Sequence, residues 1–442
     1  MRRARIASVA AVALVATTLG VAPGVGAQED EPLEATEIGI TDTTIRIAVI
    51  ADVDNAARPG LFQGSVDGVR GFVEYINDNG GLAGRQLQLD FIDSRLSADE
   101  ARSALIQACE EDFAIVGTTA LFLNNVDPMV SCVDQAGAAT GLPDVPVLQT
   151  ETNHQCSPVS YSVIPPALDC DTADQPKETY RIGMGHTRYL LKQNPDLHGV
   201  WIVPGDLRSI VNATLQQIAA TEKVGVETDD QFQVSGLSSQ AEYTPLAQAI
   251  KQNQSTYVAN GLDYKGMVFI RREAAIQGVD SVEVWSCTLQ CYDRRLLAEG
   301  GDDIEGTYVT LFFPPFEEAK QNKAINAFVK NTGKDKTDGF GGQAFAAGLF
   351  FRDVVNAVVE ADGNNGLTRA RFLEEAADIH DFTATVNGDD MLGPTDVGGH
   401  VPSGCFVVLQ VQDGKFKRVF PKEKGSLECG GKPVKVKLDL IN

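Results

Sequence analysis

The side chains best suited to binding a small molecule lie where short apolar runs of the sequence give way to polar residues. They are hydroxyl, carboxylate and aromatic side chains, namely Thr118, Thr119, Phe122, Thr150, Glu151 and Thr152 in the first half of the chain and Asp206, Asp263, Tyr264 and Trp285 in the second. Hydroxyls and carboxylates bind polar groups, while aromatic rings pack against apolar ones. These residue types predict a binding site for a small ligand with one polar end and an apolar body.

Several of these positions have a structural alternative. Thr118 and Thr119 also suit the start of a helix, where a Thr hydroxyl accepts a backbone hydrogen bond, and the sequence favours neither role. Trp285 ends an apolar run, and large aromatic side chains are mostly buried, which favours a place in the core. Asp52 and Asp54 end the first apolar run, and such carboxylates are mostly solvated.

The eight cysteines are an even number, and in an exported protein their expected fate is pairing. Their spacing places them in neighbouring pairs, which predicts the disulfides Cys109–Cys132, Cys156–Cys170, Cys287–Cys291 and Cys405–Cys429. On the chain-entropy estimate, closing loops of such lengths stabilises the fold by about 2–4 kcal/mol each.

The motifs of the common enzyme and metal sites do not occur in the sequence. It contains no Cys-x-x-Cys pair, no Gly-x-Ser-x-Gly elbow, no phosphate-binding Gly-rich loop ending in Lys-Ser or Lys-Thr, and no His-Glu-x-x-His. We therefore expect neither catalysis nor a metal or other cofactor. A secreted hydrolase stays an alternative, because residues distant in sequence can assemble a catalytic triad in the fold.

The first residues have the pattern of a secretory signal peptide. Arg2, Arg3 and Arg5 precede an uncharged run over residues 6–19, and small residues lead to an expected cleavage site after Ala27. We expect a signal peptide over 1–27 and an extracellular or periplasmic protein. No cysteine lies near the cleavage site to carry a lipid anchor.

The charge balance is strongly acidic. The chain has 37 basic and 60 acidic residues, and loss of the three signal-peptide arginines takes the net charge from −23 to −26. A field of this sign opposes binding to nucleic acid and to anionic membrane surfaces. The partner we expect from the residues alone is a small-molecule ligand, and we expect the protein to be a monomer.

Strands and helices alternate over residues 45–150, after a linker over 28–44. Ile45, Ile47 and Val49 alternate as in a strand. A helical spacing of apolar residues follows and ends at Asn79-Gly80-Gly81, a typical helix stop. Repetition of this order predicts a mostly parallel sheet with helices on both faces. This is the expected first lobe.

A second series of the same kind fills most of residues 151–330 and predicts a second lobe. Residues 331–420 start no third series, and we expect them to cross between the lobes and complete both. They end in two strands around Asp413-Gly414, a strong hairpin signal, and 421–442 form the expected C-terminal tail. The predicted fold class is α/β, with two Rossmann-like lobes.

The stretch from Gly64 to Gly117 resembles the type I solute-binding proteins of branched-chain amino acid transporters. Between Gly68 and Arg85 it carries Ile-Asn, Gly-Gly and Gly-Arg turns in the order typical of that family, and the order of elements agrees from Ile45 to Phe420. The resemblance implies two lobes joined by three crossing strands, which close by a hinge around a ligand and present it to an ABC importer.

The resemblance also implies roles for individual residues. Thr118 and Thr119 are similar to the hydroxyl pair that holds a ligand carboxylate, and Thr150 and Thr152 to its neighbours. The sequence departs from the family in its first strand-end loop and in having no acid at 285–288, where amino-acid binders place the partner of the ligand ammonium. These departures argue against leucine, isoleucine or valine, and favour a related polar or amphipathic molecule. A ligand-sensing or interaction module of the same fold is the alternative function.

Overall fold

The computed structural model describes residues 32–55, 58–173, 175–206 and 208–439. The chain divides into a unit of residues 1–32 and a compact unit of residues 33–442, and the second unit contains all the described helices and strands. The expected signal peptide lies outside the described residues. Among the helices of the described ranges, none combines the length and apolarity needed to cross a membrane.

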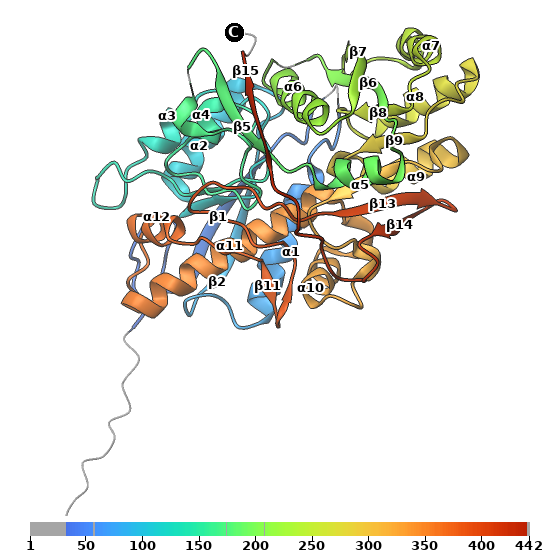
Figure 1. The fold of residues 1–442 in the computed structure, drawn as a ribbon. Coiled ribbons are helices and arrows are strands. Elements are labelled where there is room, and N and C mark those ends of the chain that lie inside the picture. The colour runs from blue at the N-terminus through green and yellow to red at the C-terminus, as the bar shows by residue number, and fades with distance from the viewer. Residues whose placement is uncertain (1–31, 56–57, 174, 207, 440–442) are drawn as a thin grey trace, which may run out of the picture. The chain divides into compact units, whose positions relative to one another are not determined.

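The first lobe is built on a parallel sheet with the strand order β2-β1-β3-β4 (Figure 1). Its strands are β1 (Thr44–Ala51), β2 (Gln86–Asp93), β3 (Ala114–Val116) and β4 (Asp144–Val145). Its helices include α1 (Gln63–Asp78), α2 (Ala98–Glu111), α3 (Asp127–Val130), α4 (Thr152–Gln155), α10 (Lys323–Thr332), α11 (Gly339–Asp362) and α12 (Arg369–Ala377). The short hairpin of β11 (Thr385–Val386) and β12 (Asp389–Asp390) packs on α10.

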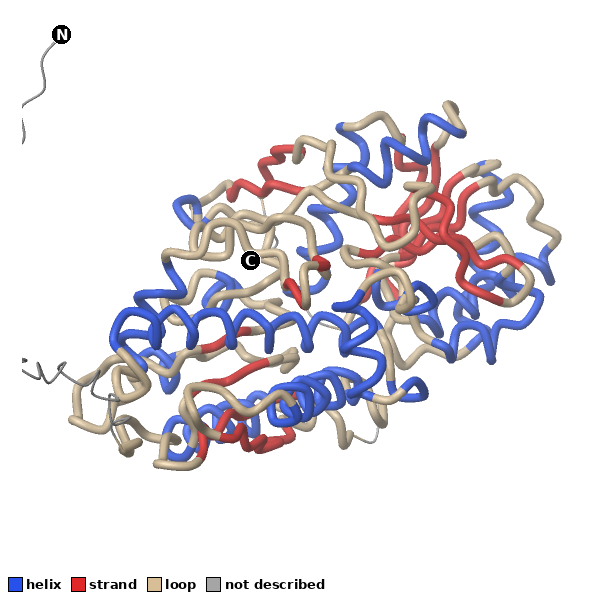
Figure 2. Tube along the Cα trace, turned by 90° about the horizontal axis from the view of Figure 1, so that it is seen from below, coloured by secondary structure: helices blue, strands red, loops and turns tan. Residues whose placement is uncertain are grey.

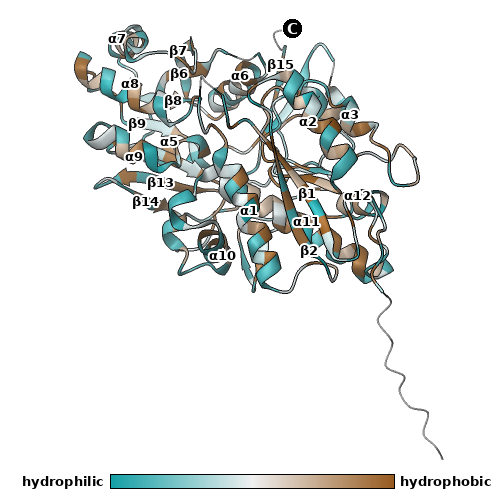
Figure 3. Cartoon of the chain, turned by 180° about the vertical axis from the view of Figure 1, so that it is seen from behind, coloured by the Kyte–Doolittle hydropathy of each residue, from teal (hydrophilic) through white to brown (hydrophobic). Residues whose placement is uncertain are grey.

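Both faces of this first sheet are covered, as the alternation of strands and helices predicts. Ile47 and Val49 of β1 pack into the same apolar cluster as α1 and α11, whereas Ala48 and Ile50 pack with α2. In Figure 3 the hydrophobic colour accordingly follows β1 and the inner side of α11. Ser97 begins α2 by accepting a hydrogen bond from the Glu100 amide.

The second lobe is built on a seven-stranded sheet with the order β14-β13-β10-β9-β8-β6-β7. Its strands are β6 (His198–Pro204), β7 (Glu227–Val234), β8 (Tyr257–Asn260), β9 (Val284–Cys287), β10 (Tyr308–Leu311), β13 (Val407–Gln412) and β14 (Lys415–Phe420). Its helices are α5 (Gly185–Gln193), α6 (Arg208–Lys223), α7 (Thr244–Asn253), α8 (Tyr264–Gln277) and α9 (Arg294–Gly300). The strands of the two sheets form separate groups in Figure 2.

The first five strands in chain order pair in parallel, and β13 and β14 add an antiparallel edge. The hairpin between them turns at Asp413 and Gly414, whose φ angles of 54° and 64° both lie in the left-handed region. That is the geometry of a tight hairpin turn, and it explains why an Asp-Gly pair occurs there.

The chain passes between the two lobes three times, as the family resemblance implies. The first passage leads from β4 to β6, the second from β10 to α10 and α11, and the third from α12 to β13. Strand β5 (Glu178–Ile182) lies in the first passage and pairs antiparallel with β15 (Val434–Leu438). The sequence patterns do not predict this pair.

Two expected elements are shorter than the sequence suggests. The apolar spacing of Val126, Met129, Val130 and Val133 predicts a helix, but the structure forms only the single turn α3 there, and the apolar run 145–148 predicts a strand, of which only the two-residue β4 forms. The carboxylate of Asp134 explains the early helix end, because it accepts hydrogen bonds from the amides of Ala136 and Ala138 and folds this segment into a turn.

All four expected disulfides are present in the structure. They are Cys109–Cys132, Cys156–Cys170, Cys287–Cys291 and Cys405–Cys429. The first ties α2 to the segment after α3, and the third closes a short turn directly after β9.

Candidate functional site

A cavity of about 440 Å³ lies between the lobes, and we call it the interlobe cavity. From the first lobe it is lined by residues 147–149 after β4 and by Phe340 and Gln343 of α11. From the second it is lined by residues at the carboxyl ends of β8 and β9. All three passages also contribute, namely through 163–167, Phe312, and the group Leu392, Gly393, Thr395, Pro402 and Ser403. Both lobes and the passages that join them therefore shape this cavity.

The polar end of the interlobe cavity is held rigidly by its own hydrogen bonds. The Asn260 amide group donates to the carbonyls of Leu262 and Asp263 at 3.1 and 3.0 Å, which fixes the loop after β8. Gln290 accepts a hydrogen bond from the Thr288 hydroxyl at 2.5 Å and donates to the Asn260 carbonyl at 3.4 Å. The chain thus presents preformed hydroxyl and carboxamide groups at the strand ends, where ligands bind in open α/β sheets.

The disulfide Cys287–Cys291 is part of this wall. Cys287 lines the cavity itself, and the bridge closes a turn whose residues 288–290 also line it. Because the bridge joins cysteines only four positions apart, it restricts the conformations of this turn directly. It therefore positions Thr288 and Gln290.

His186 of α5 lines the same cavity as a neutral side chain. Burial lowers the pKa of its imidazole to about 4, so it carries no charge near neutral pH. Its ring packs edge-on against Phe406, with the ring centroids 6.4 Å apart.

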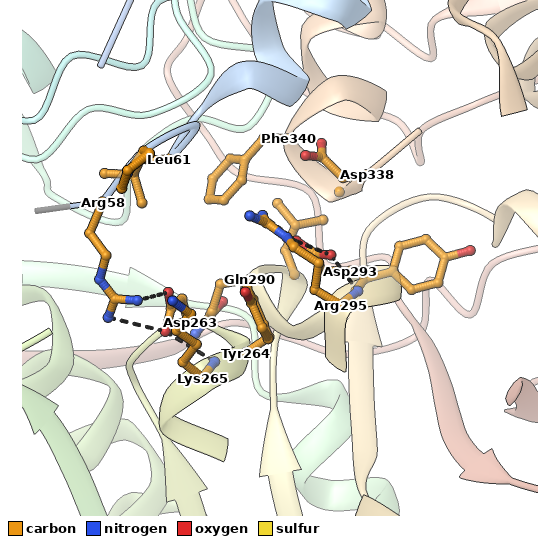
Figure 4. Close-up of a pocket in the computed structure, with 14 residues that line it drawn as sticks. Arg58, Leu61, Asp263, Tyr264, Lys265, Gln290, Asp293, Arg295, Asp338 and Phe340 are labelled. Atoms are coloured by element: carbon orange, nitrogen blue, oxygen red, sulfur yellow. Dashed lines mark hydrogen bonds and ion pairs between the residues drawn. The ribbon is translucent and has the colours of Figure 1, made fainter. Parts of the chain in front are cut away.

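A second, smaller cavity of about 70 Å³ adjoins the first and shares Leu289, Gln290 and Phe340 with it (Figure 4). Its wall is highly charged, with Arg58, Lys265 and Arg295 facing Asp263, Asp293 and Asp338. Desolvation raises the pKa of the Asp338 carboxyl to about 6, although this carboxylate accepts the Gly341 amide at the start of α11. The charged groups largely pair with one another.

Arg58 bridges the two lobes at this smaller cavity. It follows β1 of the first lobe, and its guanidinium forms an ion pair with Asp263 of the second at 2.8 Å and donates to the Gly236 carbonyl (Figure 4). Asp263 is the N-cap of α8, where it accepts hydrogen bonds from two helix amides. The side chains of Arg58 and Asp263 are 16% and 24% exposed, so the pair is partly shielded from water.

The structure brings two of the ten predicted ligand residues into these cavities. Asp263 and Tyr264 line the smaller one, and the Tyr264 hydroxyl donates to Glu299 at 2.9 Å. Asp206 is exposed and accepts the Gly236 amide. Trp285 packs in the core beneath the Arg271 guanidinium, 4.8 Å from the ring centroid. The wall of the interlobe cavity begins at the next residue, so the structure places Trp285 in the core, its alternative role.

Thr118 and Thr119 are fully buried and line neither cavity. The Thr118 hydroxyl donates to Asp144 at 2.7 Å, and the same carboxylate binds His154 at 2.7 Å and Ser160 at 2.9 Å. The hydroxyl of Thr118 is thus already used inside the first lobe. Neither Thr118 nor Thr119 caps a helix, because α3 is the helix that follows them before β4 and its N-cap is Val126.

The other four predicted residues also lie outside the two cavities. Phe122, Thr150, Glu151 and Thr152 are partly exposed. Thr150 donates to the Leu121 carbonyl at 3.0 Å, while Glu151 and Thr152 begin the single-turn helix α4. Ligand contact by these residues stays a prediction.

Sequence reasoning missed most of the residues that line the interlobe cavity. For Thr288 and Gln290 the sequence carries a signal of a functional position, since they lie between two closely spaced cysteines after an expected strand. Arg58 had a weaker one, because it follows the first strand-end loop. The lining residues of α6 had none, since their spacing is that of any buried helix face. Within the described residues, no group of three or more His, Cys, Asp or Glu side chains is placed to bind a metal.

A family model described as "Periplasmic binding protein" matches residues 44–415. No curated protein matches the chain. Among solved structures, a leucine binding protein from Thermotoga maritima has a TM-score of 0.62 at 16% identity, over 85% of this chain and 97% of that one. A fatty acid ABC transporter substrate-binding protein from Thermomonospora curvata has a TM-score of 0.65 at 14% identity, over 90% and 94% of the two chains.

A third structure, an ABC transporter substrate-binding protein from Desulfitobacterium hafniense in complex with Leu, has a TM-score of 0.58 at 15% identity, over 85% of this chain and 100% of that one. At such identities these structures support the fold. The family match spans far more than half of the chain and confirms the resemblance of the sequence to solute-binding proteins. The chain belongs to the periplasmic binding protein family, with the two-lobed type I α/β fold.

Proposed function

We propose that this protein is the extracytoplasmic solute receptor of an ABC importer, which captures a small molecule between its lobes and presents it to a membrane permease. The observation that carries the proposal is the interlobe cavity, which receives residues from both lobes and all three passages. A ligand held there contacts every part of the molecule that moves when the lobes rotate. Its binding free energy therefore favours the closed arrangement.

The same geometry supports transport by a closing receptor in preference to catalysis. The polar groups at the cavity end are hydroxyls and carboxamides, and Asn260, Thr288 and Gln290 are bound to one another or to the backbone. Such groups orient a ligand, but they supply neither an activated nucleophile nor a general base. Export of the protein, as expected from the first 27 residues, agrees with this role.

The names of the structural relatives suggest two kinds of ligand. One relative is a leucine binding protein and another belongs to a fatty acid transporter. For this chain we propose a small molecule with a polar end at the β8 and β9 strand ends and an apolar body, which includes an amino acid or a related amide or carboxylate. A cavity of about 440 Å³ lies within the usual range for small-molecule sites.

Native mass spectrometry of the protein as purified tests this function. We expect a retained small molecule in the native spectrum that is lost on denaturation. Small-angle scattering should show a smaller radius of gyration when the ligand is added back to the stripped protein. A tightly bound ligand that leaves the radius unchanged would argue for a rigid sensing module, and conversion of the ligand into a product would argue for an enzyme.

A further inference from the structure

The interlobe cavity extends well beyond the strand ends, into the second lobe. Its lining includes Ile210 and Thr221 of α6, which are eleven positions apart and therefore about 16 Å apart along the helix axis. On the opposite side it includes Tyr257 and Asn260, the first and last residues of β8. The cavity thus runs between α6 and the sheet as an elongated channel that opens at the strand ends.

The walls of this channel are mainly apolar. Ile210 and Ala213 face it from α6, and Trp201 and Ala259 face it from the sheet. Some hydroxyl and carboxamide groups of the cavity, among them those of Ser286 and Gln290, lie where the channel meets the carboxyl end of β9, and α6 adds Thr214, Gln217 and Thr221 along the channel. A ligand that fills this space has a polar group at that end and an extended apolar body between α6 and the sheet.

The charges of the lining exclude one common kind of ligand. Among the described residues that line the interlobe cavity there is no Asp or Glu. The only Arg or Lys among them is Arg181, whose guanidinium is already bound to Asp169 at 2.8 Å. A ligand ammonium in this cavity would have no carboxylate partner and a ligand carboxylate no free Arg or Lys partner, and burying an unpaired charge of either sign is costly.

We propose that the ligand is an elongated aliphatic molecule with an uncharged polar head, whose chain lies between α6 and the second sheet. This inference rests on the proposed receptor function and names its substrate class. It excludes free α-amino acids, which are short and carry charged groups. Medium-chain aliphatic amides have the required shape and an uncharged head.

Titration calorimetry with a chain-length series tests the channel. For stripped protein and the probes hexanamide, octanamide, decanamide and dodecanamide, we expect affinity to rise about fourfold with each added CH₂ group, as burial of a methylene predicts. Dodecylammonium has a chain of the same length with a cationic head and should bind at least tenfold more weakly than dodecanamide. Equal affinity of these two probes, or an affinity independent of chain length, would overturn the proposal.

A variant that fills the channel locates the site. Ala213→Trp places a large side chain on the channel face of α6 and should weaken dodecanamide binding at least tenfold without lowering the melting temperature. Glu222→Trp adds the same side chain at an exposed position of α6 and should leave the affinity unchanged. Unchanged affinity in Ala213→Trp would contradict the channel, and if this variant does not fold, the chain-length series decides alone.

Leucine separates this inference from the function on which it rests. If leucine binds more tightly than dodecanamide and closes the lobes, the elongated ligand is wrong and the receptor function stands. If neither probe binds, the protein as purified retains no small molecule, and the radius of gyration never changes, then the receptor function itself is wrong.

Discussion

At the scale of single residues, the least expected feature is a fully buried arginine that acts as a structural link. Arg369 of α12 has no exposed surface and donates hydrogen bonds to the backbone carbonyls of Cys109, Asp112, Phe113 and Val133. These carbonyls come from the end of α2 and the segments that follow it. One side chain thereby joins a late helix to the first sheet.

We expect Arg369→Ala to lower the free energy of unfolding by about 3–5 kcal/mol, because several buried carbonyls lose their donor at about 1–3 kcal/mol each. Urea unfolding followed by circular dichroism measures this. Arg371 of the same helix is a matched control, since it is partly exposed and pairs with Asp362, Glu374 and Glu375, and such pairs contribute little. Equal losses in the two alanine variants would contradict the structural role of Arg369.

The neighbouring threonines of the first lobe allow a sharp comparison. Thr118→Val should cost about 1–3 kcal/mol, because it leaves the buried Asp144 carboxylate without one of its donors. Thr119→Val should be close to neutral, since the Thr119 hydroxyl is buried without a hydrogen-bond partner. Thermal unfolding decides between these outcomes. If Thr119→Val instead weakens ligand binding at unchanged stability, then Thr119 contacts the ligand as the family resemblance implies.

At the scale of elements, the sequence predicted the alternation of strands and helices but not the depth of the cavity. Apolar residues recur with a period of two in β1 and with helical spacing in α1. Such patterns indicate which faces of an element are buried. The channel beside α6 depends on how far a helix sits from a sheet, and no local pattern carries that distance. The pairing of β5 with β15 joins segments more than 200 residues apart and was missed for the same reason.

The positions of the functional residues were likewise predictable only in part. Parallel strands share a carboxyl edge, which predicts that strand ends gather around a cleft; residues after β4 and at the ends of β8 and β9 line the interlobe cavity, whereas residues 117–122 after β3 do not. Which side chain of a strand end reaches the cavity was not predictable, because Trp285 and Ser286 are neighbours with opposite fates. The roles assigned to the threonines came from the resemblance alone, and the buried Asp144 now gives Thr118 a structural partner.

The disulfides Cys405–Cys429 and Cys287–Cys291 close loops of different length. We expect the first to contribute more to stability and the second to matter more for ligand binding. Replacing Cys405 and Cys429 by alanine opens a link across 24 positions and should lower the free energy of unfolding by about 3.5 kcal/mol on the chain-entropy estimate. Replacing Cys287 and Cys291 by alanine opens a link across 4 positions and should lower it by about 2 kcal/mol. The second change frees the cavity turn 288–290, so only it should weaken ligand binding, by about tenfold. Denaturant titration and calorimetry on both double variants test this, and equal ligand affinities would show that the bridge does not position the turn.

At the scale of the whole molecule, the two lobes are built on separate sheets and meet through three passages and direct contacts, which include apolar packing within one shared cluster. The partly shielded ion pair between Arg58 and Asp263 is one of these contacts, since it joins the loop after β1 to the start of α8. Such a pair exists only while the lobes are close together. Its free energy therefore adds to that of the ligand in favouring the closed arrangement.

Removing this pair should weaken ligand binding without unfolding either lobe. We expect Arg58→Ala and Asp263→Asn each to raise the ligand Kd about three- to tenfold, the range for a contact worth about 1 kcal/mol. Asparagine is as good an N-cap as aspartate, so Asp263→Asn removes the charge and keeps the start of α8. The double variant should bind ligand no more weakly than the weaker single variant, because the two side chains act as one contact.

Lys265→Ala is the control, since Lys265 lines the same small cavity but belongs to the second lobe alone, and it should leave the Kd unchanged. Additive losses in the double variant would mean that Arg58 and Asp263 act separately, for example through direct contact with the ligand, and that ligand alone holds the lobes together.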